Sequence, residues 1–571
     1  MKNADIARIL YDIAIYLEMQ GENVFKIRAY EKAAQSIEGM TEDVGDVYRK
    51  GGFASLTSIP GVGPGIAEKI EELLETGKLE YYEKLKKKIP VDLEGLRRIE
   101  GVGPKTILVL YKKLKVQTID DLEKAARAGK IRKLPGFGEK TEENILKGIE
   151  FAKKNSGRFV LGHVLPLVNT IEKRLQSLSY VQKAIVAGST RRRKETVGDI
   201  DILVVSHEPA KVMNYFVSMP EVARIYGKGE TKSTVKLSSG IDVDIRVVEE
   251  RSFGSALNYF TGSKDHNIAL RRIAIAQGLK LSEYGLFRGT KQVAGKTEED
   301  VYKTLGLRYI EPELRENTGE LEAARKNALP KLIGYGDLKG DLQVQTSWTD
   351  GAHTIEAMAR AAQQAGLAYI AITDHTKSLA MTGGLDEAKL AKQGKEIDAL
   401  NKRLDGITLL KGAEVNIMKD GKLDIADKAF AQLDVTGAAA HSHFNLSRAE
   451  QTQRIIAAME NEHVDILFHP TGRIILKREA YDVDIEAVID AAKRTGTVLE
   501  IDAYPDRLDL RDEHIRLAVH EGVKLAIDSD AHHQAHFAHL QLGVAQARRG
   551  WAEKKDIINA WPMKQMFKAL K

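Results

Sequence analysis

The order of apolar and polar positions changes twice along the chain. Up to about residue 155, apolar residues recur at the spacing of amphipathic helices, which predicts a helical region. Between Phe159 and about Val248, apolar runs typical of strands alternate with helical segments, and Arg251–Gly306 is mixed. From Leu332 onward, apolar runs that end in polar residues alternate with helices of about ten to fifteen residues. Such units are typical of a β/α barrel, whose active site lies where the strands end.

These changes predict a multidomain protein, because 571 residues are too many for one hydrophobic core. Glu311–Leu329 is charged, weakly patterned and contains Pro312, so we expect a linker there. The predicted segments are a helical region up to about residue 155, an α+β region at 156–315, a linker at 316–334 and a distorted β/α barrel at 335–571.

Charge and histidine are unevenly distributed. Residues 1–335 carry a net charge of +10 and residues 336–571 one of −5, which favours a polyanionic partner for the front part. Twelve of the fifteen histidines follow residue 350, which suggests a metal site in the barrel. The absence of cysteine excludes disulfides and thiolate ligands. The acidic first helix is wrong for a signal peptide and no apolar stretch approaches a membrane span, so we expect a cytoplasmic protein without a membrane partner.

One short motif occurs three times in the helical region, at Ile59–Gly63, Ile99–Gly103 and Leu134–Gly138. Each copy precedes an amphipathic helix, and the motif resembles the helix-hairpin-helix. Its glycines form a tight turn whose amides can bind a phosphate at the helix start. Backbone amides do not distinguish bases, so we expect sequence-independent DNA binding. The glycines concerned are Gly61, Gly63, Gly101, Gly103, Gly136 and Gly138.

Aspartates stand at the head of two predicted strands. Asp199 and Asp201 are two residues apart and therefore point to one face of a strand, and Asp242 and Asp244 repeat this spacing. Buried carboxylates need a cationic partner. Two Mg²⁺ ions about 3.5–4 Å apart, as in phosphoryl transfer, would supply it.

A glycine and a serine follow the preceding apolar run. Gly188 would let a triphosphate approach the backbone, and Ser189 could donate to it. Together with the aspartates, they predict a phosphoryl-transfer site that accepts a triphosphate.

Together these motifs resemble those of bacterial and archaeal family X DNA polymerases that carry a C-terminal PHP (polymerase and histidinol phosphatase) domain. The matching motifs are Ala187–Arg192, Gly198–Asp201, Val243–Arg246 and Tyr259–Ser263, and the resemblance covers essentially the whole chain. It implies a lyase-like 5′-phosphate-binding domain at 1–80, a thumb-like helix-hairpin-helix domain at 81–155, a nucleotidyltransferase palm at 156–250, fingers at 251–315 and a PHP phosphoesterase domain at 335–571.

The resemblance also implies roles in the polymerase site. Asp199 and Asp201 would hold both metal ions, and Asp244 would join them at the catalytic ion and help to activate the primer 3′-hydroxyl. The implied nucleotide-binding residues are Gly188, Ser189, Arg192 and Arg158 at the triphosphate, Tyr259, Phe260 and Gly262 at the sugar, Asn267 at the base and Arg271 at the nascent pair.

In the first domain the resemblance implies a 5′-phosphate pocket at Lys26, Tyr30 and Lys32, with Lys69 in the position of a Schiff-base lysine. A lysine needs a lowered pKa to act as a nucleophile. The family has a basic residue where this chain has Gly65, so we expect 5′-phosphate binding, and the sequence leaves lyase activity open.

The barrel departs from its family at two metal ligands. The PHP pattern opens with His-x-His, and here Gln343 and Gln345 occupy both positions. An amide oxygen is a poorer ligand than imidazole for Mn²⁺ or Zn²⁺. The other ligand positions match, at Asp350, His375, Glu414, His441, His469, Asp530 and His532. We therefore expect Mn²⁺ or Zn²⁺ to bind with one subsite weakened, which would impair the 3′→5′ exonuclease or phosphodiesterase.

The sequence thus predicts a monomeric DNA polymerase that adds dNTPs to the primer 3′ end in gapped or primer–template DNA, with two Mg²⁺ or Mn²⁺ ions, in base-excision or end repair. Three alternatives stay open: mainly a metal-dependent exonuclease whose polymerase half positions DNA, a non-catalytic DNA-end-binding scaffold, and a transferase without a template. Gln343 and Gln345 argue against the first, the palm aspartates against the second, and Asn267 with Arg271 against the third.

Overall fold

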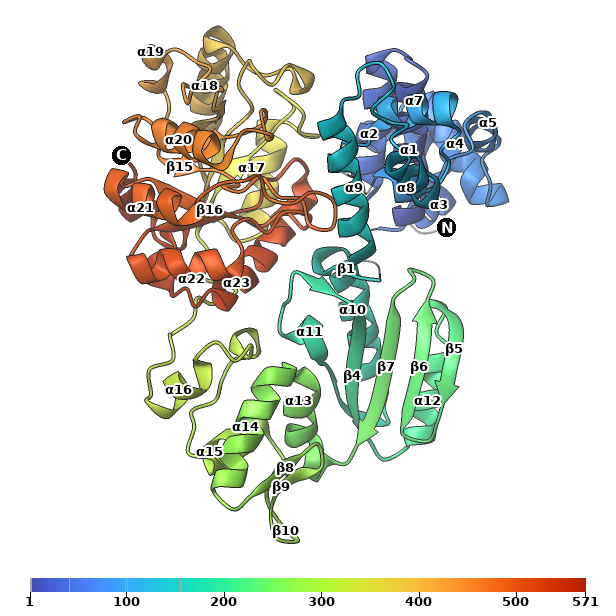
Figure 1. Ribbon diagram of the computed structural model, residues 1–571, viewed down its shortest axis with the longest axis vertical. Coiled ribbons are helices and arrows are strands. Elements are labelled where there is room, and N and C mark those ends of the chain that lie inside the picture. Colours follow the sequence, from blue (N-terminus) through green and yellow to red (C-terminus); the bar gives the residue numbers. More distant parts are fainter. Residues whose placement is uncertain (1–2, 39, 41, 98, 100, 155–156) are drawn as a thin grey trace.

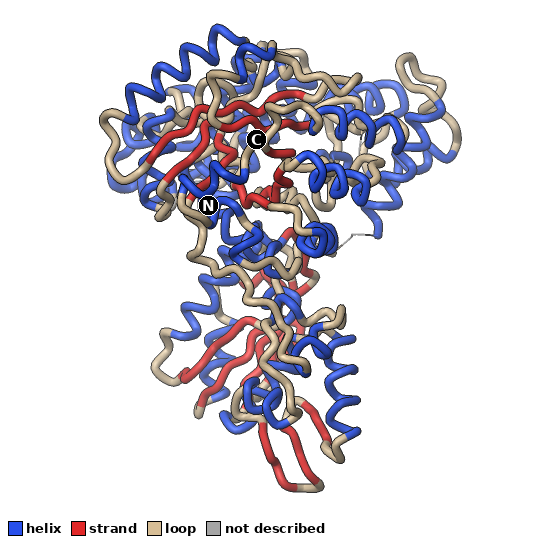
Figure 2. The backbone as a smooth tube through the Cα atoms, turned by 90° about the vertical axis from the view of Figure 1, so that its left-hand side faces the viewer, coloured by secondary structure: helices blue, strands red, loops and turns tan. Residues whose placement is uncertain are grey.

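The computed structural model describes residues 3–38, 40, 42–97, 99, 101–154 and 157–571. The helical N-terminal region and the β/α barrel lie side by side, and the α+β part lies below both (Figure 1). The view turned by 90° shows the α+β part as a separate lower body, which ends in a β-hairpin (Figure 2). The predicted multidomain fold, helical, then α+β, then a β/α barrel, is confirmed.

The N-terminal region is built from helices that close over one apolar core. The predicted amphipathic first helix is present, with Ile6, Leu10 and Ile13 fully buried. The helices are α1 (Asn3–Met19), α2 (Val24–Glu38), α3 (Val44–Thr57), α4 (Pro64–Thr76), α5 (Glu80–Lys88), α6 (Leu93–Arg97), α7 (Pro104–Leu114), α8 (Ile119–Arg127) and α9 (Glu139–Lys154). The domain boundary expected at 155/156, and Glu100 of the second glycine motif, lie outside the described residues.

A five-stranded sheet forms the upper half of the α+β part, in the order β2-β4-β7-β6-β5. The neighbouring inner strands β4 and β7 run parallel, and the other pairs are antiparallel. The elements are β1 (Phe159–Val160), α10 (Leu161–Gln176), β2 (Val181–Val186), α11 (Gly188–Arg191), β3 (Thr196–Val197), β4 (Asp199–Ser206), α12 (Pro209–Val217), β5 (Val222–Lys228), β6 (Lys232–Leu237) and β7 (Asp242–Val248). Because Ile200 and Ile202–Val205 are buried, β4 can hold its two aspartates rigidly at its start.

The lower half combines helices with a small three-stranded sheet. Its elements are α13 (Phe253–Thr261), α14 (Lys264–Ala276), β8 (Lys280–Ser282), β9 (Gly285–Arg288), β10 (Lys291–Ala294), α15 (Glu298–Thr304) and the 3₁₀ turn η2 (Pro312–Leu314).

The predicted linker at 316–334 is packed rather than extended. It contains α16 (Glu320–Arg325), and Leu321 and Ala324 join the apolar core below the palm. Glu320 is fully buried against His266, at 2.6 Å from its Nδ1 atom. The charged sequence suggested a linker, but the buried carboxylate of Glu320 has a hydrogen-bond partner in His266, 54 residues away.

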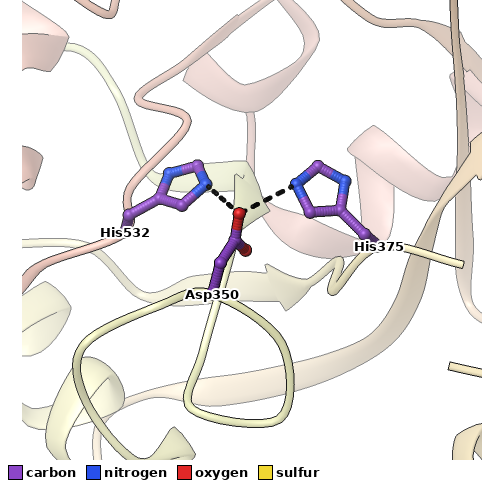
Figure 3. Close-up of side chains that lie close together, drawn as sticks. All are labelled: Asp350, His375 and His532. Carbon is purple, nitrogen blue, oxygen red and sulfur yellow. Dashed lines mark ion pairs between the residues drawn. The ribbon is translucent and has the colours of Figure 1, made fainter. Parts of the chain in front are cut away.

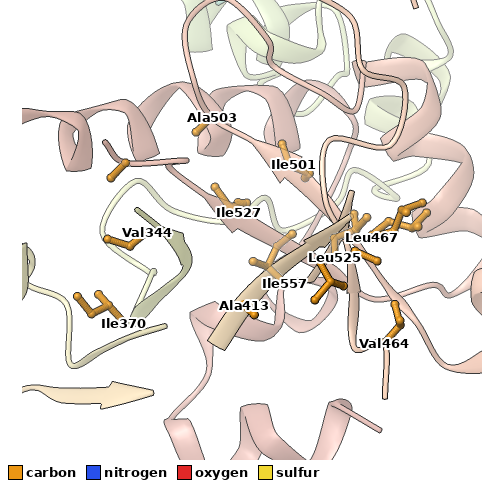
Figure 4. Close-up of a cluster of buried hydrophobic side chains, with 14 of the residues drawn as sticks. Val344, Ile370, Ala413, Val464, Leu467, Ile501, Ala503, Leu525, Ile527 and Ile557 are labelled. Atoms are coloured by element: carbon orange, nitrogen blue, oxygen red, sulfur yellow. The ribbon is translucent and has the colours of Figure 1, made fainter. Parts of the chain in front are cut away.

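The C-terminal part is a nearly closed barrel of seven parallel strands, β11 to β17 in sequence order. The Gln345 amide donates to the Ala531 carbonyl at 2.9 Å, which links the first strand to the last. Apolar side chains from the strands fill the core (Figure 4). The strands are β11 (Gly340–Val344), β12 (Tyr369–Ile372), β13 (Thr408–Asn416), β14 (Val435–Ala439), β15 (Ile466–Leu467), β16 (Val498–Asp502) and β17 (Leu525–Asp528).

Helices surround the barrel on its outside (Figure 1). They are α17 (Ile355–Gln364), α18 (Glu387–Asn401), α19 (Asp427–Phe430), α20 (Arg448–Met459), α21 (Ile485–Thr495), α22 (Asp512–Glu521), α23 (Leu540–Arg549) and α24 (Met563–Met566). In the described part of the chain, we find no helix with the length and apolar character that a membrane crossing requires.

An ion pair joins the palm to the barrel. His163 of α10 lies 2.6 Å from Asp506, which also pairs with Lys477 at 2.5 Å. Burial lowers the pKa of His163, but the carboxylate of Asp506 outweighs it, and the net shift is upward from 6.5.

Replacing His163 by glutamine is expected to remove a pH-dependent part of the stability. Because the folded-state pKa is raised, the pair contributes fully below about pH 6.5 and loses its contribution as pH rises through the raised value. The His163 side chain is 52% exposed, so we expect at most about 1 kcal/mol. Thermal melts at about pH 6 and about pH 8.5 should show a gap between parent and variant only at the lower pH.

Lys477→Gln is the matched control, since it removes the other cation that pairs with Asp506 and leaves His163 in place. Its effect should be the same at both pH values. An equal loss at both pH values for His163→Gln would contradict the prediction.

Candidate active sites

The palm sheet brings the predicted metal-binding aspartates together. In the parallel pairing of β4 and β7, Asp199 stands opposite Asp242 and Asp201 opposite Asp244. Burial, then the charges of Asp199 and Asp244, raise the pKa of Asp201 to about 6. Carboxylates held this close repel one another, which is the environment that a divalent cation stabilises. The donor set therefore fits the expected pair of Mg²⁺ or Mn²⁺ ions.

Neighbouring groups hold Asp244 more firmly than Asp242. Thr234 Oγ1 donates to Asp244 Oδ1 at 2.6 Å, and Lys232 Nζ lies 2.9 Å from its Oδ2. Asp242 is 46% exposed and pairs with Lys236 at 2.8 Å. The geometry thus favours Asp244 as the third metal ligand.

Gly188 begins the short helix α11 directly beside Asp201. Its φ is 63°, and a Cβ added there would lie only 2.6 Å from Asp201 Oδ2. Only glycine allows this approach without strain. Ser189 follows on the same helix and is half-buried.

Arg192 lies at the end of α11 and reaches toward the segment after α13. Its Nη1 donates to the Thr261 carbonyl, and its Nε donates to Glu316 Oε1 at 3.0 Å. A Cβ on Gly262 would come within 3.0 Å of Arg192 Nη1. The structure therefore brings Arg192 and Gly262 into one group next to the palm aspartates.

The other predicted nucleotide-binding residues lie around this group. Tyr259 and Phe260 meet edge to face with ring centroids 5.1 Å apart, and Tyr259 is 37% exposed. Asn267 Nδ2 donates to the Tyr259 carbonyl at 2.7 Å, while its buried Oδ1 has no partner among the described residues. Arg271 is exposed one turn further along α14. Arg158 donates to the side chain and carbonyl of Thr196, at 2.8 and 2.5 Å.

The three glycine motifs adopt the same turn. In each, the fourth residue donates its amide to the first residue's carbonyl at 3.0 Å, from Val62 to Ile59, Val102 to Ile99 and Phe137 to Leu134. The first glycines have φ of 80°, 78° and 84° (Gly61, Gly101, Gly136). Gly63 and Gly103 cap the starts of α4 and α7, and Gly138 precedes α9. Free amides at a helix start can bind a phosphate, so these turns suit the predicted role.

The predicted 5′-phosphate residues are only partly gathered. The Lys69 ammonium lies 5.2 Å from the ring centre of Tyr81 and donates to the Gly65 carbonyl at 2.8 Å. Tyr30 is buried, and burial, with Tyr81 nearby, raises the pKa of its phenol. The Lys32 stem packs on the first hairpin, because a Cβ on Gly61 would lie 2.8 Å from its Cγ. Lys26 is exposed and pairs with Glu22.

The barrel strands bring all seven predicted ligands into one connected site. Two groups of three are close enough to hold an ion, Asp350 with His375 and His532, and His375 with Glu414 and His441. Figure 3 shows Asp350 between the rings of His375 and His532, each 3.7 Å away. His469 Nε2 lies 3.0 Å from Glu414, and Asp530 lies 3.7 Å from His532.

Neighbouring imidazoles and carboxylates in this site shift the pKa values of one another strongly. Burial would raise the pKa of Glu414, but the imidazoles of His375 and His441 hold it well below its usual range. Burial would lower the pKa of His532, but Asp530 and Asp350 raise it to about 10. Histidine and carboxylate donors of this kind fit Mn²⁺ or Zn²⁺.

Gln343 lies on β11 and Gln345 directly follows its last residue, and both side chains are fully buried. Gln345 Nε2 donates to Glu414 Oε2 at 2.8 Å, so an amide occupies an oxygen that could otherwise bind a cation. Both amide atoms of Gln343 and the Oε1 of Gln345 have no partner among the described residues. Unpaired buried amides are costly, which points to a site shaped for other ligands.

Comparison with known proteins agrees with this geometry. Residues 1–79 match a helix-hairpin-helix domain, 93–150 a SAM-like helix-hairpin-helix tandem, 256–316 a DNA polymerase beta thumb and 341–557 a PHP domain. The chain is 39% identical over 575 residues to the DNA polymerase/3′-5′ exonuclease PolX of Bacillus subtilis, and the alignment covers 100% of both chains. The protein belongs to the family X DNA polymerases with a PHP domain.

Other relatives resemble parts of this family X polymerase. DNA polymerase lambda of Rattus norvegicus is 27% identical over 344 residues, 55% of this chain and 56% of the relative. A probable phosphatase of a Thermoanaerobacter species is 36% identical over 189 residues, 31% of this chain and 72% of the relative. The match to a DNA polymerase beta thumb at 256–316 overlaps the segment that the sequence analysis assigned to the fingers, 251–315, whereas that analysis placed a thumb-like domain at 81–155.

Several residues that hold the predicted ones in place are not evident from the sequence of the polymerase. Lys232 and Thr234 hold Asp244 from the next strand, and the turn at Ser238–Gly240 could have revealed their register. Glu316 accepts a hydrogen bond from the Arg192 side chain, and Arg549 donates one to the Arg192 carbonyl. No local pattern in the sequence predicts these contacts, because Arg549 lies 357 residues from Arg192.

Proposed function

We propose that this family X polymerase fills short gaps in DNA during base-excision or end repair, and that Gln343 and Gln345 impair the 3′→5′ exonuclease of its PHP domain. The proposal rests on the register of Asp199, Asp201 and Asp244 beside the glycine of α11. A cluster of three carboxylates next to a phosphate-binding turn suits nucleotidyl transfer.

The chain's own residues define the roles in the reaction. Asp199 and Asp201 would hold two Mg²⁺ or Mn²⁺ ions and Asp244 one of them; the ions supply charge stabilisation to the reacting oxygens. Gly188 and Ser189 would receive the triphosphate, and Arg192 would neutralise it. Tyr259, Phe260 and Gly262 would fit the sugar, Asn267 the base, Arg158 the phosphates and Arg271 the nascent pair.

The helical region would hold the DNA. The amides of the three hairpins would bind backbone phosphates, and Lys26, Tyr30, Lys32 and Lys69 the 5′-phosphate downstream of the gap. Lys69 donates to its own helix and faces Tyr81, which supports a role in binding more than one in lyase chemistry. The domain limits stated from the sequence are part of this proposal.

The barrel would bind Mn²⁺ or Zn²⁺ at Asp350, His375, Glu414, His441, His469, Asp530 and His532. Its hydrolysis would be slow, because the subsite that the missing imidazoles would serve is occupied by amides.

One experiment on gapped DNA tests the proposed function. With Mg²⁺ and dNTPs, the full chain should extend a labelled primer across a gap of a few nucleotides and shorten it only slowly without dNTPs. A 5′-phosphate downstream should strengthen binding by about tenfold, since a charge-assisted contact is worth about 1.5–3 kcal/mol. Binding should also weaken steeply with salt.

Lys32→Gln is the matched variant for the phosphate contact. It should reduce the preference for the phosphorylated gap while affinity for the gap without phosphate changes little. Shortening without extension would favour the exonuclease alternative, and binding without either reaction would favour the scaffold.

A further inference from the structure

The nucleotide side of the palm is tied to the barrel through one carboxylate. Glu316 Oε1 accepts from Arg192 Nε at 3.0 Å and from Arg549 Nη1 at 3.1 Å. Arg192 belongs to the palm, Glu316 to the connecting segment and Arg549 to the barrel helix α23. Three parts of the chain thus meet within hydrogen-bond distance.

Arg549 is built into this junction. Its side chain is only 2% exposed, its Nη1 also donates to the Arg192 carbonyl at 3.0 Å, and its Nη2 pairs with Asp512 of α22. A buried guanidinium needs all of these acceptors, because an unpaired buried charge is strongly destabilising. Arg549 therefore fixes both the backbone of Arg192 and the carboxylate that orients its side chain.

Charge balance explains why the second arginine matters. Alone, Glu316 would neutralise Arg192 and oppose the attraction between Arg192 and a triphosphate. Arg549 shares the same oxygen and is itself paired with Asp512, and Lys194 Nζ lies 4.0 Å from Glu316 Oε1, so three cations face two carboxylates at the junction and its net charge stays positive. Nε and Nη1 of Arg192 are anchored, whereas its Nη2 has no hydrogen bond to any described residue and can turn to a ligand.

We propose that Arg549 of the barrel is a positioning residue of the polymerase reaction, which acts through Glu316 and Arg192 on the bound triphosphate. The inference rests on the proposed role of Arg192. It gives the barrel a part in nucleotide addition that needs none of its metal ligands.

The neighbouring arginine provides a matched control. Arg548 also belongs to α23 and is mostly buried, but it pairs with Glu313 at 2.8 Å and donates to the Ile333 carbonyl at 2.9 Å. Both arginines join the barrel to the polymerase half, yet only Arg549 contacts Arg192. Substitution of either arginine should therefore weaken the interface between the barrel and the polymerase half. Only substitution of Arg549 should also weaken dNTP binding.

The test measures primer extension by full-length variants against dNTP concentration. Arg549→Gln should raise KM for the dNTP by about tenfold with a smaller change in kcat, as expected for a lost binding contribution. Arg548→Gln should leave the KM for the dNTP within about twofold of the parent, even if it lowers the melting temperature as much as Arg549→Gln does. Adding Glu316→Gln to Arg549→Gln should lower KM again, because the unbalanced carboxylate is then gone.

Each possible result either supports or overturns the positioning role of Arg549. Equal KM values for Arg549→Gln and Arg548→Gln would overturn the inference, as would a double variant no better than Arg549→Gln. If Arg549→Gln does not fold, Arg549→Lys replaces it: an unchanged KM would overturn the inference, and a raised KM would support it. Arg192→Gln tests the proposed role of Arg192 separately from that of Arg549. An unchanged KM for the dNTP in this variant would refute the role of Arg192 in triphosphate binding.

Discussion

Replacing Asp201 by asparagine is expected to reduce nucleotide addition by at least about a thousandfold while DNA affinity changes little. Asp201 is the carboxylate closest to Gly188, and it shares one face of the sheet with Asp199 and Asp244. Its loss should remove several kcal/mol of transition-state stabilisation, and about 1.4 kcal/mol corresponds to tenfold in rate. Asp199→Ala and Asp201→Ala should behave alike. Single-nucleotide extension of gapped DNA, beside a binding titration, measures both quantities.

The variant should not be less stable than the parent in the presence of a chelator. Burial and the charges of Asp199 and Asp244 disfavour the charged Asp201, so a neutral amide relieves repulsion. A melting temperature at or above that of the parent would show that lost activity is not lost folding.

Asp242→Asn is the matched control for Asp201→Asn. Asp242 lies on the same face but is paired with Lys236 and half-exposed, so extension should stay within about threefold of the parent. Extension by Asp201→Asn near the parental rate would refute the palm assignment. A loss as large for Asp242→Asn would place the third ligand there instead of at Asp244.

Replacing Gln345 by histidine is expected to raise Mn²⁺-dependent 3′→5′ degradation by at least about tenfold. The Gln345 amide now donates to Glu414, and an imidazole would free that carboxylate and add a ligand. The two side chains are similar in size, so the buried position can accept the change. Nucleotide addition should not change, because Asp199, Asp201 and Asp244 lie in the palm.

Gln343→His is the paired variant. Gln343 lies two residues earlier, on β11, and its amide makes no hydrogen bond to Glu414 or to any other described residue, so its replacement should add less activity. Bound Mn²⁺ or Zn²⁺ should be measured beside the degradation rate. If the parent already degrades 3′ ends as fast as Gln345→His with the same metal content, the glutamines do not impair the nuclease.

Local patterns in the sequence were enough to predict the fold class, and they named most of the residues that the structure gathers in the two candidate sites. The two-residue spacing of Asp199 and Asp201 placed them on one strand face, because side-chain direction in a strand repeats every two residues. Repeated glycines predicted the three hairpins, since only a positive φ closes that turn. Ligands at successive strand ends converge because parallel strands share one edge.

Only the tertiary structure decided which residues support the predicted ones. The charged segment after Pro312 suggested a linker, yet Glu316 and Glu320 are bound by Arg192, Arg549 and His266. These partners lie 54 to 233 residues away, and no local period of the sequence carries that information. Hydrophobic spacing specifies elements and their faces, whereas the pairing of buried charges depends on how whole domains pack.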